Sequence, residues 1–226
     1  MDFSFLPKYY MFFVNGAKVT LLLSLFTVII GVVLGVILAL MRLSRIAPLK
    51  MIATAYIEFI RGTPLLVQLF LFYYGLPQLG IEFPEVPALG TAFPEFLAGV
   101  VALSVNSAAY VAETFRAGIQ AIDKGQMEAA RSLGMPHSMA MRHIILPQAI
   151  RNVLPALGNE FIVIIKESSI VSVIGISELM YNADTVRGNS FRAFEPLIIV
   201  AIIYFVITFT LSKVLGIAER RMRTSD

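Results

Sequence analysis

Three polar side chains, Gln68, Asn106 and Glu160, lie near the middle of long apolar runs. If such runs cross a bilayer, a carboxylate near its centre costs about 2.5–3.5 kcal/mol on insertion scales, so it normally faces a partner or a cavity. The nearest cation to Glu160 along the chain is Lys166, more than one helical turn away. Glu160 could therefore line a solute pathway or bond a neighbouring helix. The two amides could bond between helices or converge with Glu160 on one polar cavity.

Two further carboxylates have an arginine three residues later. Glu58 precedes Arg61, and Glu113 precedes Arg116. Side chains at this spacing lie on one face of a helix, so each pair can neutralise itself near the cytoplasmic half of a span. The same carboxylates could instead contact a solute.

Other candidates lie near these groups. Asn159 directly precedes Glu160, while Ser168 and Ser169 follow at the predicted external end of that run. Their hydroxyls could meet a carboxylate or simply cap the helix. Pro64 would kink the second apolar run and release backbone groups that a cavity could use. The residues predicted to contact a solute are Glu160, Asn159, Asn106, Gln68, Glu58, Glu113, Ser168 and Ser169.

The composition excludes several classes of function. The 226 residues are 58% hydrophobic with a mean hydropathy of +0.80, whereas apolar residues make up about half of a soluble domain. The absence of cysteine excludes disulfides and thiol nucleophiles, and two histidines alone cannot form a buried metal cage. There is no Walker-type phosphate loop, Rossmann glycine triplet or zinc-binding H-E-x-x-H. We therefore expect an integral membrane protein that is not an enzyme and binds no metal or cofactor itself.

Five apolar runs are long enough to cross a bilayer, which takes about 20 residues. They cover approximately residues 19–40, 52–76, 96–119, 150–165 and 194–216. The sequence thus predicts an all-α integral membrane fold, with five transmembrane helices in one domain over residues 1–226. We interpret Val171–Ile176, which is too short to cross, as a re-entrant or interfacial turn. The N-terminus is interpreted as a retained first span rather than a cleaved signal peptide.

Basic residues mark one side of the predicted membrane. Eleven of the 18 Lys and Arg residues lie in the connections after the first and third runs and at the end of the fifth. The loop Pro77–Pro94 carries only Glu82 and Glu85 as charges. The positive-inside rule therefore predicts an external N-terminus and a cytoplasmic C-terminus. This topology explains the net charge of +3 without a nucleic-acid partner.

A polar, proline-punctuated segment over residues 121–147 separates the third and fourth runs. Its composition predicts two short helices, the first with Glu128 and Arg131 at a pairing distance of three residues. Gly134 is expected to end that helix in the left-handed conformation, and Pro136 restarts the chain. The segment could be an interfacial helix on the membrane or a docking element for a soluble partner.

The same segment resembles the cytoplasmic loop of ABC importer membrane subunits. That signature reads EAA, three residues, Gly, nine residues, then I-x-L-P, and residues 128–147 meet every fixed position and gap. The resemblance implies a coupling loop that sits in a groove of an ATPase subunit. The implied coupling residues are Glu128, Ala129, Ala130, Arg131, Leu133, Gly134, Pro136, Ile144, Leu146 and Pro147.

Most of the remaining chain resembles the polar amino acid branch of these importers, with a type I importer fold. The matching segments are residues 59–68, 106–113, 115–119, 157–160 and 168–175. The resemblance implies a bacterial plasma (inner) membrane location and a second membrane subunit, expected to be another copy. It also implies two ATPase subunits, which hold the ATP and magnesium, and an external solute-binding protein.

The solute is expected to be a polar or basic amino acid. Relatives often carry glutamine at the position of Glu160, so its added negative charge favours arginine, lysine or histidine. Importers of glutamine or glutamate share most of these motifs and remain an alternative. A channel or secondary carrier that works without an ATPase, or a membrane scaffold, is a further alternative.

Overall fold

The apolar composition and the hydrogen bonding of the backbone within each segment favour an all-helical fold. The computed structural model describes residues 1–85 and 92–223, and within these ranges the regular structure is entirely helical. A helix satisfies its backbone amides within one segment, as a lipid environment requires. The α-helices are α1 (Leu6–Leu43), α2 (Ala47–Arg61), α3 (Leu65–Phe70), α4 (Leu76–Gln78), α5 (Phe93–Gln120), α6 (Lys124–Ser132), α7 (His137–Ala140), α8 (Leu146–Glu167), α9 (Leu179–Ser190) and α10 (Glu195–Arg223).

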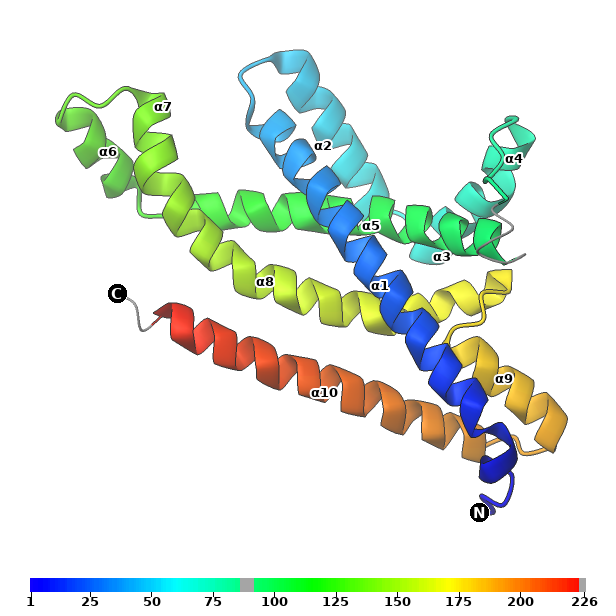
Figure 1. Ribbon diagram of the computed structural model, residues 1–226. Coiled ribbons are helices and arrows are strands. Elements are labelled where there is room, and N and C mark those ends of the chain that lie inside the picture. The colour runs from blue at the N-terminus through cyan, green and yellow to red at the C-terminus, as the bar shows by residue number, and fades with distance from the viewer. Residues whose placement is uncertain (86–91, 224–226) are drawn as a thin grey trace.

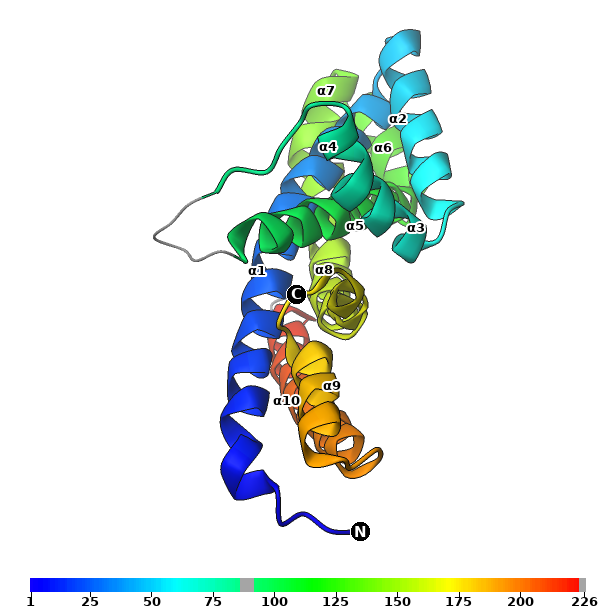
Figure 2. The same ribbon diagram turned by 90° about the vertical axis from the view of Figure 1, so that its right-hand side faces the viewer.

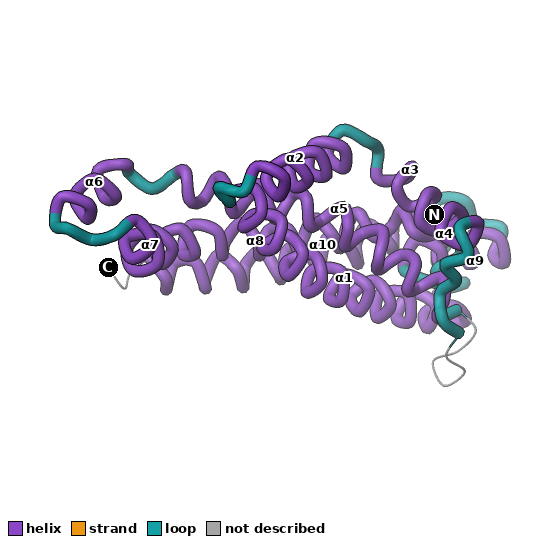
Figure 3. Tube along the Cα trace, turned by 90° about the horizontal axis from the view of Figure 1, so that it is seen from above, coloured by secondary structure: helices purple, strands orange, loops and turns teal. Residues whose placement is uncertain are grey.

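Helices α5, α8 and α10 run alongside one another, and α1 crosses them obliquely (Figure 1). Helices α6 and α7 lie at one end of this arrangement together with the C-terminus, whereas α4, α9 and the N-terminus lie at the other end (Figures 1 and 3). Viewed along α5 and α8, the molecule is elongated, with α9 and α10 at the opposite end from α2 (Figure 2). The 121–147 segment, which is expected to contact the ATPase, therefore lies at the same end of the molecule as the C-terminus.

Among the described residues, three helices are long and apolar enough to cross a membrane: α1, α5 and α10. A fourth candidate is the pair α2 plus Leu65–Gln78, whose two parts are bent by 109°. Helix α8, over the predicted fourth span, carries several charged residues and is not among these candidates. The all-helical prediction is confirmed, with three to four candidate spans by length and composition within the described residues.

The bend between α2 and α3 follows from local sequence. Pro64 has no amide hydrogen and adopts an extended conformation, with φ of −64° and ψ of 138°. Gly62, just after Arg61, ends α2. The kink predicted at Pro64 is therefore present. A π-helical segment, Leu71–Gly75, continues the chain from α3 to α4.

Small residues bring α1 onto α5. Gly31 and Gly35 lie four residues apart on α1, the spacing of close helix contacts in membranes. A Cβ atom on Gly35 would lie 2.5 Å from Cγ1 of Val111, and one on Gly31 would lie 2.9 Å from the hydroxyl oxygen of Ser107. These positions therefore have no room for a side chain.

The apolar patch Val171–Ile176 packs into the core. It follows α8 as a 3₁₀ helix, Ser168–Ile174, that ends at Gly175 with a left-handed φ of 87°. Val171 and Ile174 are buried in a cluster that includes Leu23 and Val100. The patch therefore contacts α1 and α5 rather than lying on the surface. Residues 86–91 of the predicted external loop lie outside the described residues.

Candidate functional site

Glu160 lies on α8, half-buried, and faces α5. The hydroxyl of Ser107 donates a hydrogen bond of 3.0 Å to Oε1 of Glu160. Ser107 itself is buried and packs against Gly31 of α1. Glu160 is thus positioned by a neutral hydroxyl, and it bonds a neighbouring helix as one of the two sequence interpretations predicted.

Gln68 and Asn106 are buried and bind each other. The Asn106 amide nitrogen donates to Oε1 of Gln68 at 2.9 Å. The Gln68 nitrogen is within hydrogen-bond range of the carbonyl of Ile60 at 2.7 Å, the carbonyl of Thr63 at 3.0 Å and the Thr63 hydroxyl at 2.9 Å. Gln68 therefore completes the broken end of α2, which accounts for its 2% exposure without an unsatisfied amide.

These polar groups share one level of α5 but point in different directions. Asn106 and Ser107 are consecutive, and consecutive residues of an α-helix are separated by about 100° around the axis. Asn106 contacts α3, whereas Ser107 contacts α8. Gln68 and Glu160 therefore both contact α5, but on different sides, and the three side chains do not form one set of contacts.

Glu113 forms a charged cluster with arginines from three helices. Its Oε2 accepts from Arg42 of α1 at 2.7 Å and lies 4.0 Å from Arg61 of α2. Its Oε1 accepts from Arg116, at 3.0 Å from Nε. The predicted pairing of Glu113 with Arg116 is present. Arg61 also lies over the ring of Tyr110, 5.6 Å from its centroid, so its guanidinium turns towards α5.

The other predicted solute-contacting residues lie apart from these contacts. Asn159 and Glu58 are exposed. The Ser168 hydroxyl donates to the carbonyl of Ile165 at 2.8 Å, and that of Ser169 donates to the carbonyl of Lys166 at 2.9 Å. The two serines therefore cap the end of α8, the structural alternative considered from the sequence. Their predicted contact with a solute stays a prediction.

Helix α6 has a capping contact at each end. The Asp123 side chain accepts from the Gly125 amide at 2.6 Å and so caps the first turn. At the other end, Gly134 has a φ of 84°. The amides of Gly134 and Met135 donate to the carbonyls of Arg131 and Ala130 at 3.0 and 3.1 Å, a Schellman motif. The predicted end of the helix at Gly134 is confirmed.

One face of α6 is open. Ala130 is buried, whereas Glu128, Ala129 and Arg131 are exposed. Leu133, three residues after Ala130, is not on the inward face, because it is 84% exposed. The helix ends at Ser132. Leu133 therefore leaves the inward face and projects outward, between two short helices.

The chain returns from α7 through a π-helical segment, Met141–Ile145, that leads into α8. Pro136 precedes α7 in an extended conformation. Of the I-x-L-P residues, Ile144 and Leu146 are half-buried and Pro147 is exposed. Pro147 lies in the first turn of α8, directly after the π-helical segment.

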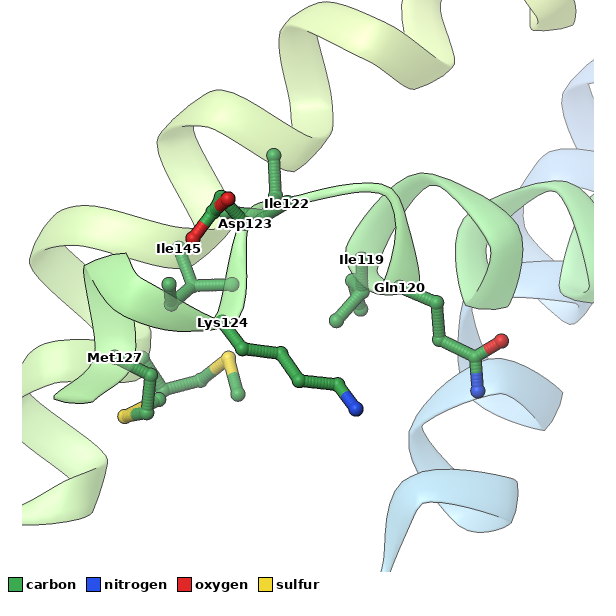
Figure 4. Close-up of a pocket in the computed structure, with 8 residues that line it drawn as sticks. Ile119, Gln120, Ile122, Asp123, Lys124, Met127 and Ile145 are labelled. Atoms are coloured by element: carbon green, nitrogen blue, oxygen red, sulfur yellow. The ribbon is translucent and has the colours of Figure 1, made fainter.

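A groove of about 470 Å³ lies at the base of this segment (Figure 4). Ile119 and Gln120 lie on one side, Met127 and Ile145 on the other, and the Lys124 side chain extends between them. The full lining is Ile119, Gln120, Ile122, Asp123, Lys124, Met127, Met141 and Ile145. The groove therefore separates the helix that enters the segment from the helix that leaves it.

Two contacts of the charged residues were missed in the sequence. Ser107 binds Glu160, and its position one residue after Asn106 was the available signal. Arg42 binds Glu113 across a separation of 71 residues, which no spacing rule addresses. A buried carboxylate, Glu178, was also missed. It caps α9 through the amides of Met180 and Tyr181 and accepts from the Tyr204 hydroxyl at 3.1 Å.

Known proteins resemble the whole chain. It is 44% identical over 225 residues to the "Probable glutamine ABC transporter permease protein GlnM" of Bacillus subtilis (strain 168), covering 100% of both chains. It is 43% identical over 227 residues to the "Arginine transport system permease protein ArtQ" of the same organism, covering 100% of this chain and 99% of the relative.

Solved structures agree with these relatives. A crystal structure of an amino acid ABC transporter with histidines contains a chain that is 56% identical, with a TM-score of 0.90 and coverage of 98% and 99%. A chain of the MetNI methionine ABC transporter in an inward-facing conformation shares the fold at 19% identity and a TM-score of 0.72, with the same coverage.

The sequence profile of one transport family matches residues 31–224, most of the chain. Its description is "Binding-protein-dependent transport system inner membrane component". This match and the full-length amino acid permease relatives confirm the resemblance stated from the sequence. The chain belongs to the family of inner membrane components of binding-protein-dependent transport systems, as a permease subunit of an amino acid ABC importer.

Proposed function

We propose that this chain forms the solute pathway of an ATP-driven amino acid importer together with a second copy of itself. Two ATPase subunits bind the ATP and magnesium on the cytoplasmic side, and an external solute-binding protein delivers the amino acid. The family assignment supports this assembly. ATP hydrolysis then takes place outside this chain, which is not an enzyme.

Five spans make up the proposed topology, with the N-terminus outside and the C-terminus in the cytoplasm. Helix α8 is the fourth span, and its charged and polar residues face the pathway and the other helices. Support comes from the position of the C-terminus and of α6 at the same end of the molecule (Figure 1). Basic residues concentrate in the connections at that end.

Helix α6 is the proposed coupling helix of the 121–147 loop. Its exposed residues Glu128, Ala129 and Arg131, with the projecting Leu133, suit a groove on the ATPase. The Schellman motif at Gly134 closes the last turn of α6, which supports its use as a lever. Closure of the ATPase pair would move both levers and open the pathway outward. Since a ligand shifts a conformational equilibrium only by differential affinity, ATP and the loaded binding protein must both favour the outward state.

Glu160 is the proposed contact for the solute, with Asn159 beside it. The observation that carries this proposal is a half-buried carboxylate positioned by the Ser107 hydroxyl at 3.0 Å. A carboxylate at this depth is costly unless it has a function or a partner, and a neutral hydroxyl leaves its negative charge uncompensated. A cationic side chain of arginine, lysine or histidine would compensate it.

Glutamine is the second candidate, because a glutamine permease relative is as similar as the arginine one, at 44% against 43% identity. A neutral amide can also donate to Glu160, although it brings no charge. Glutamate remains the less favoured acidic alternative. The charge of Glu160 therefore distinguishes these solutes.

The deciding experiment is uptake into liposomes that contain the chain, its ATPase and its binding protein. Labelled arginine and glutamine would each be tested with wild type and with Glu160→Gln. We expect Glu160→Gln to lose most arginine uptake, by a factor of about ten or more for one lost charge interaction of about 1.4 kcal/mol. Unchanged arginine uptake, with the ATPase still assembled, would contradict the role of Glu160. Uptake of glutamine alone by the wild type would decide for the second candidate.

A further inference from the structure

The exposed face of α8 carries polar side chains at a spacing of seven residues. Asn152, Asn159 and Lys166 are all exposed in the single chain. Glu167, next to Lys166, is exposed as well. Residues seven apart lie on one stripe of a helix. Helices α1, α5 and α10 pack against α8 and lie on three sides of it in the view along the helix (Figure 2). The polar stripe therefore follows the side of α8 that these helices leave open.

Lys166 and Glu167 lie at hydrocarbon depth in the proposed topology, on which this inference rests. Glu160 binds Ser107, and Ser107 lies at the middle of α5. The two charged residues follow Glu160 by six and seven positions, about 10 Å along α8 towards the external side. The hydrocarbon core of a bilayer is about 30 Å thick, so its external boundary lies about 15 Å from the middle. Both charges therefore lie inside it.

The segment that follows these charges supports this depth. A Cβ atom on Gly99 of α5 would lie 2.6 Å from Cδ1 of Ile176 and 3.6 Å from Cγ1 of Val171. Gly99 precedes Ser107 by eight residues, about 12 Å along α5. The chain after α8 thus still packs beside the membrane-spanning part of α5, and the end of α8 does not project out of the membrane.

Neither Lys166 nor Glu167 forms an ion pair within residues 1–85 and 92–223. A charged side chain at hydrocarbon depth is costly, so it normally faces the interior of a protein or a water-filled cavity and pairs with an opposite charge. In the proposed assembly the ATPase is cytoplasmic and the solute-binding protein is external. The component that reaches this depth is the second copy of the chain.

The two charges suit a contact with two-fold symmetry. Lys166 and Glu167 are consecutive, so their side chains point about 100° apart around α8, one on each side of the direction midway between them. If that direction faces a two-fold axis along the membrane normal, the rotation places Glu167 of the second copy opposite Lys166, and the reverse. The contact then contains two pairs of opposite charge and no net charge.

We infer that Lys166 of each copy pairs with Glu167 of the other copy, and that these two pairs close the external end of the solute pathway. They lie about two helical turns from Glu160 on the external side, so a solute that reaches Glu160 from outside must pass them. The pairs must separate when the pathway opens outward. They therefore stabilise the state that is closed to the outside, against which ATP and the loaded binding protein act.

Cross-linking between copies tests the contact, because the chain has no native cysteine. One tagged copy carries Lys166→Cys and a differently tagged copy carries Glu167→Cys, both assembled with the ATPase. The reagent is a short bismaleimide, since Lys and Glu side chains span more than a disulfide does. We expect a cross-linked dimer without ATP. ATP bound to a hydrolysis-deficient ATPase should lower the yield about fivefold, because it shifts the population to the outward state.

Leu154→Cys in both copies is the control for the cross-link. Leu154 is also exposed on α8, but it points about 120° away from Lys166. It should give no cross-linked dimer. A dimer through Leu154, or none through the Lys166→Cys and Glu167→Cys pair, would overturn the contact.

Charge reversal tests the pairing itself. Lys166→Glu places two carboxylates opposite each other in both pairs, so it should destabilise the closed state. We expect ATP hydrolysis without the binding protein to rise about tenfold. The double variant Lys166→Glu/Glu167→Lys restores both pairs in exchanged order and should return near the wild-type rate. Lys8→Glu makes the same change of charge in the first turn of α1 and should have no effect.

Co-elution of the ATPase would show that each variant is assembled. A double variant that stays as impaired as Lys166→Glu would overturn the pairing, because a residue that contacts solute or water directly is not rescued by exchange with its neighbour. Equal hydrolysis in wild type, Lys166→Glu and Lys8→Glu would overturn it too.

This inference and the proposed function fail separately, because the cross-link needs no transport. Normal ATP-driven amino acid uptake without the cross-link would remove only the charge pairs. A cross-link between copies without any amino acid uptake would remove only the transport proposal. Tagged copies that do not co-purify would contradict the proposed homodimer, and these pairs with it.

Discussion

The hydroxyl of Ser107 donates to Oε1 of Glu160 at 3.0 Å, and this hydrogen bond joins α5 to α8 where Gly31 of α1 packs on the same serine. Three helices therefore meet at one carboxylate. While this bond holds, α8 and α5 move together, and a shift of α8 relative to α5 must break it. The contact thus connects the packing of the bundle to the orientation of Glu160.

Ser107→Ala should impair arginine uptake while the complex still assembles. The substitution removes the donor that orients Glu160, and an unsatisfied acceptor costs about 1–3 kcal/mol when buried. Because Glu160 is only half-buried, we expect the lower part of that range, an increase of about tenfold in the arginine concentration for half-maximal uptake. Ser104→Ala is the control, since the Ser104 hydroxyl makes only a long 3.4 Å contact to the Thr27 carbonyl. Equal effects of the two substitutions would contradict a specific role for Ser107.

Gln68→Leu should destabilise the protein whatever the solute. It removes the donor to the Thr63 carbonyl and the acceptor of the Asn106 amide, at a cost of about 1–3 kcal/mol, whereas the Ile60 carbonyl keeps the Thr63 amide and hydroxyl as donors. Thermal unfolding in detergent measures the effect, and Gln78→Leu at the exposed end of α4 should change little.

A double-mutant cycle with Asn106→Leu identifies the contact. If the two amides mainly satisfy each other, the double variant should lose less stability than the sum of the single variants. Additive losses of stability, together with a changed solute preference, would instead assign both side chains to solute binding.

Gly35→Ala should also lower the thermal unfolding temperature. Its new methyl group would lie 2.5 Å from Cγ1 of Val111 and 3.0 Å from the Ala108 carbonyl oxygen, and overpacking of this kind costs about 1–3 kcal/mol. Gly216→Ala on α10 has nothing within 4 Å. It should be neutral or slightly stabilising, because alanine favours the helix by about 1 kcal/mol. A stable Gly35→Ala variant would mean that α1 packs less closely on α5.

Gly134→Val should reduce ATP-driven uptake without preventing insertion in the membrane. A Cβ at this position meets nothing within 4 Å, so the cost comes from the φ of 84° alone. That conformation costs about 1–2 kcal/mol for residues other than glycine, and asparagine tolerates it better than valine. We therefore expect Gly134→Asn to retain more uptake per ATP hydrolysed than Gly134→Val. If wild type and both variants transport the same amount of amino acid per ATP hydrolysed, the proposal that α6 acts as a lever would be contradicted.

Single-cysteine labelling can establish the topology, because the chain has no native cysteine. Asn189→Cys on α9 and Ser138→Cys on α7 are both exposed and lie at opposite ends of the molecule. An impermeant thiol reagent should label Asn189→Cys in intact cells, and Ser138→Cys only after permeabilisation. The reverse pattern would invert the proposed orientation.

Much of the local structure could be predicted from sequence, because local rules act over one helical turn. Gly134 ends α6, Pro64 bends the chain, and Glu113 pairs with Arg116 three residues later. The particular partners of Gln68 and Glu160 could not be predicted, although a bond to a neighbouring helix was one interpretation of each. Their partners depend on how helices distant in sequence pack against each other, which spacing within one helix does not report. The same limit concealed the contact of Arg42 with Glu113.

The exposure of a side chain near a helix end is another property that periodicity does not report. Leu133 continues the three-residue spacing of Met127 and Ala130, yet it projects outward because α6 ends one residue earlier. A periodic pattern predicts a face only while the helix lasts. Near a helix end, the capping conformation decides where the side chain points.

The angle of 109° between α2 and Leu65–Gln78 also limits how far the two parts can reach. At 1.5 Å per residue, helices of these lengths joined at that angle extend about 25 Å in their best common direction. The hydrocarbon core of a typical bilayer is about 30 Å thick. In the proposed five-span topology the bent pair would therefore have a negative hydrophobic mismatch, which thinner membranes relieve and thicker ones increase. In that topology, lipid acyl-chain length is expected to act on this bend before it acts on the longer helices α1 and α10.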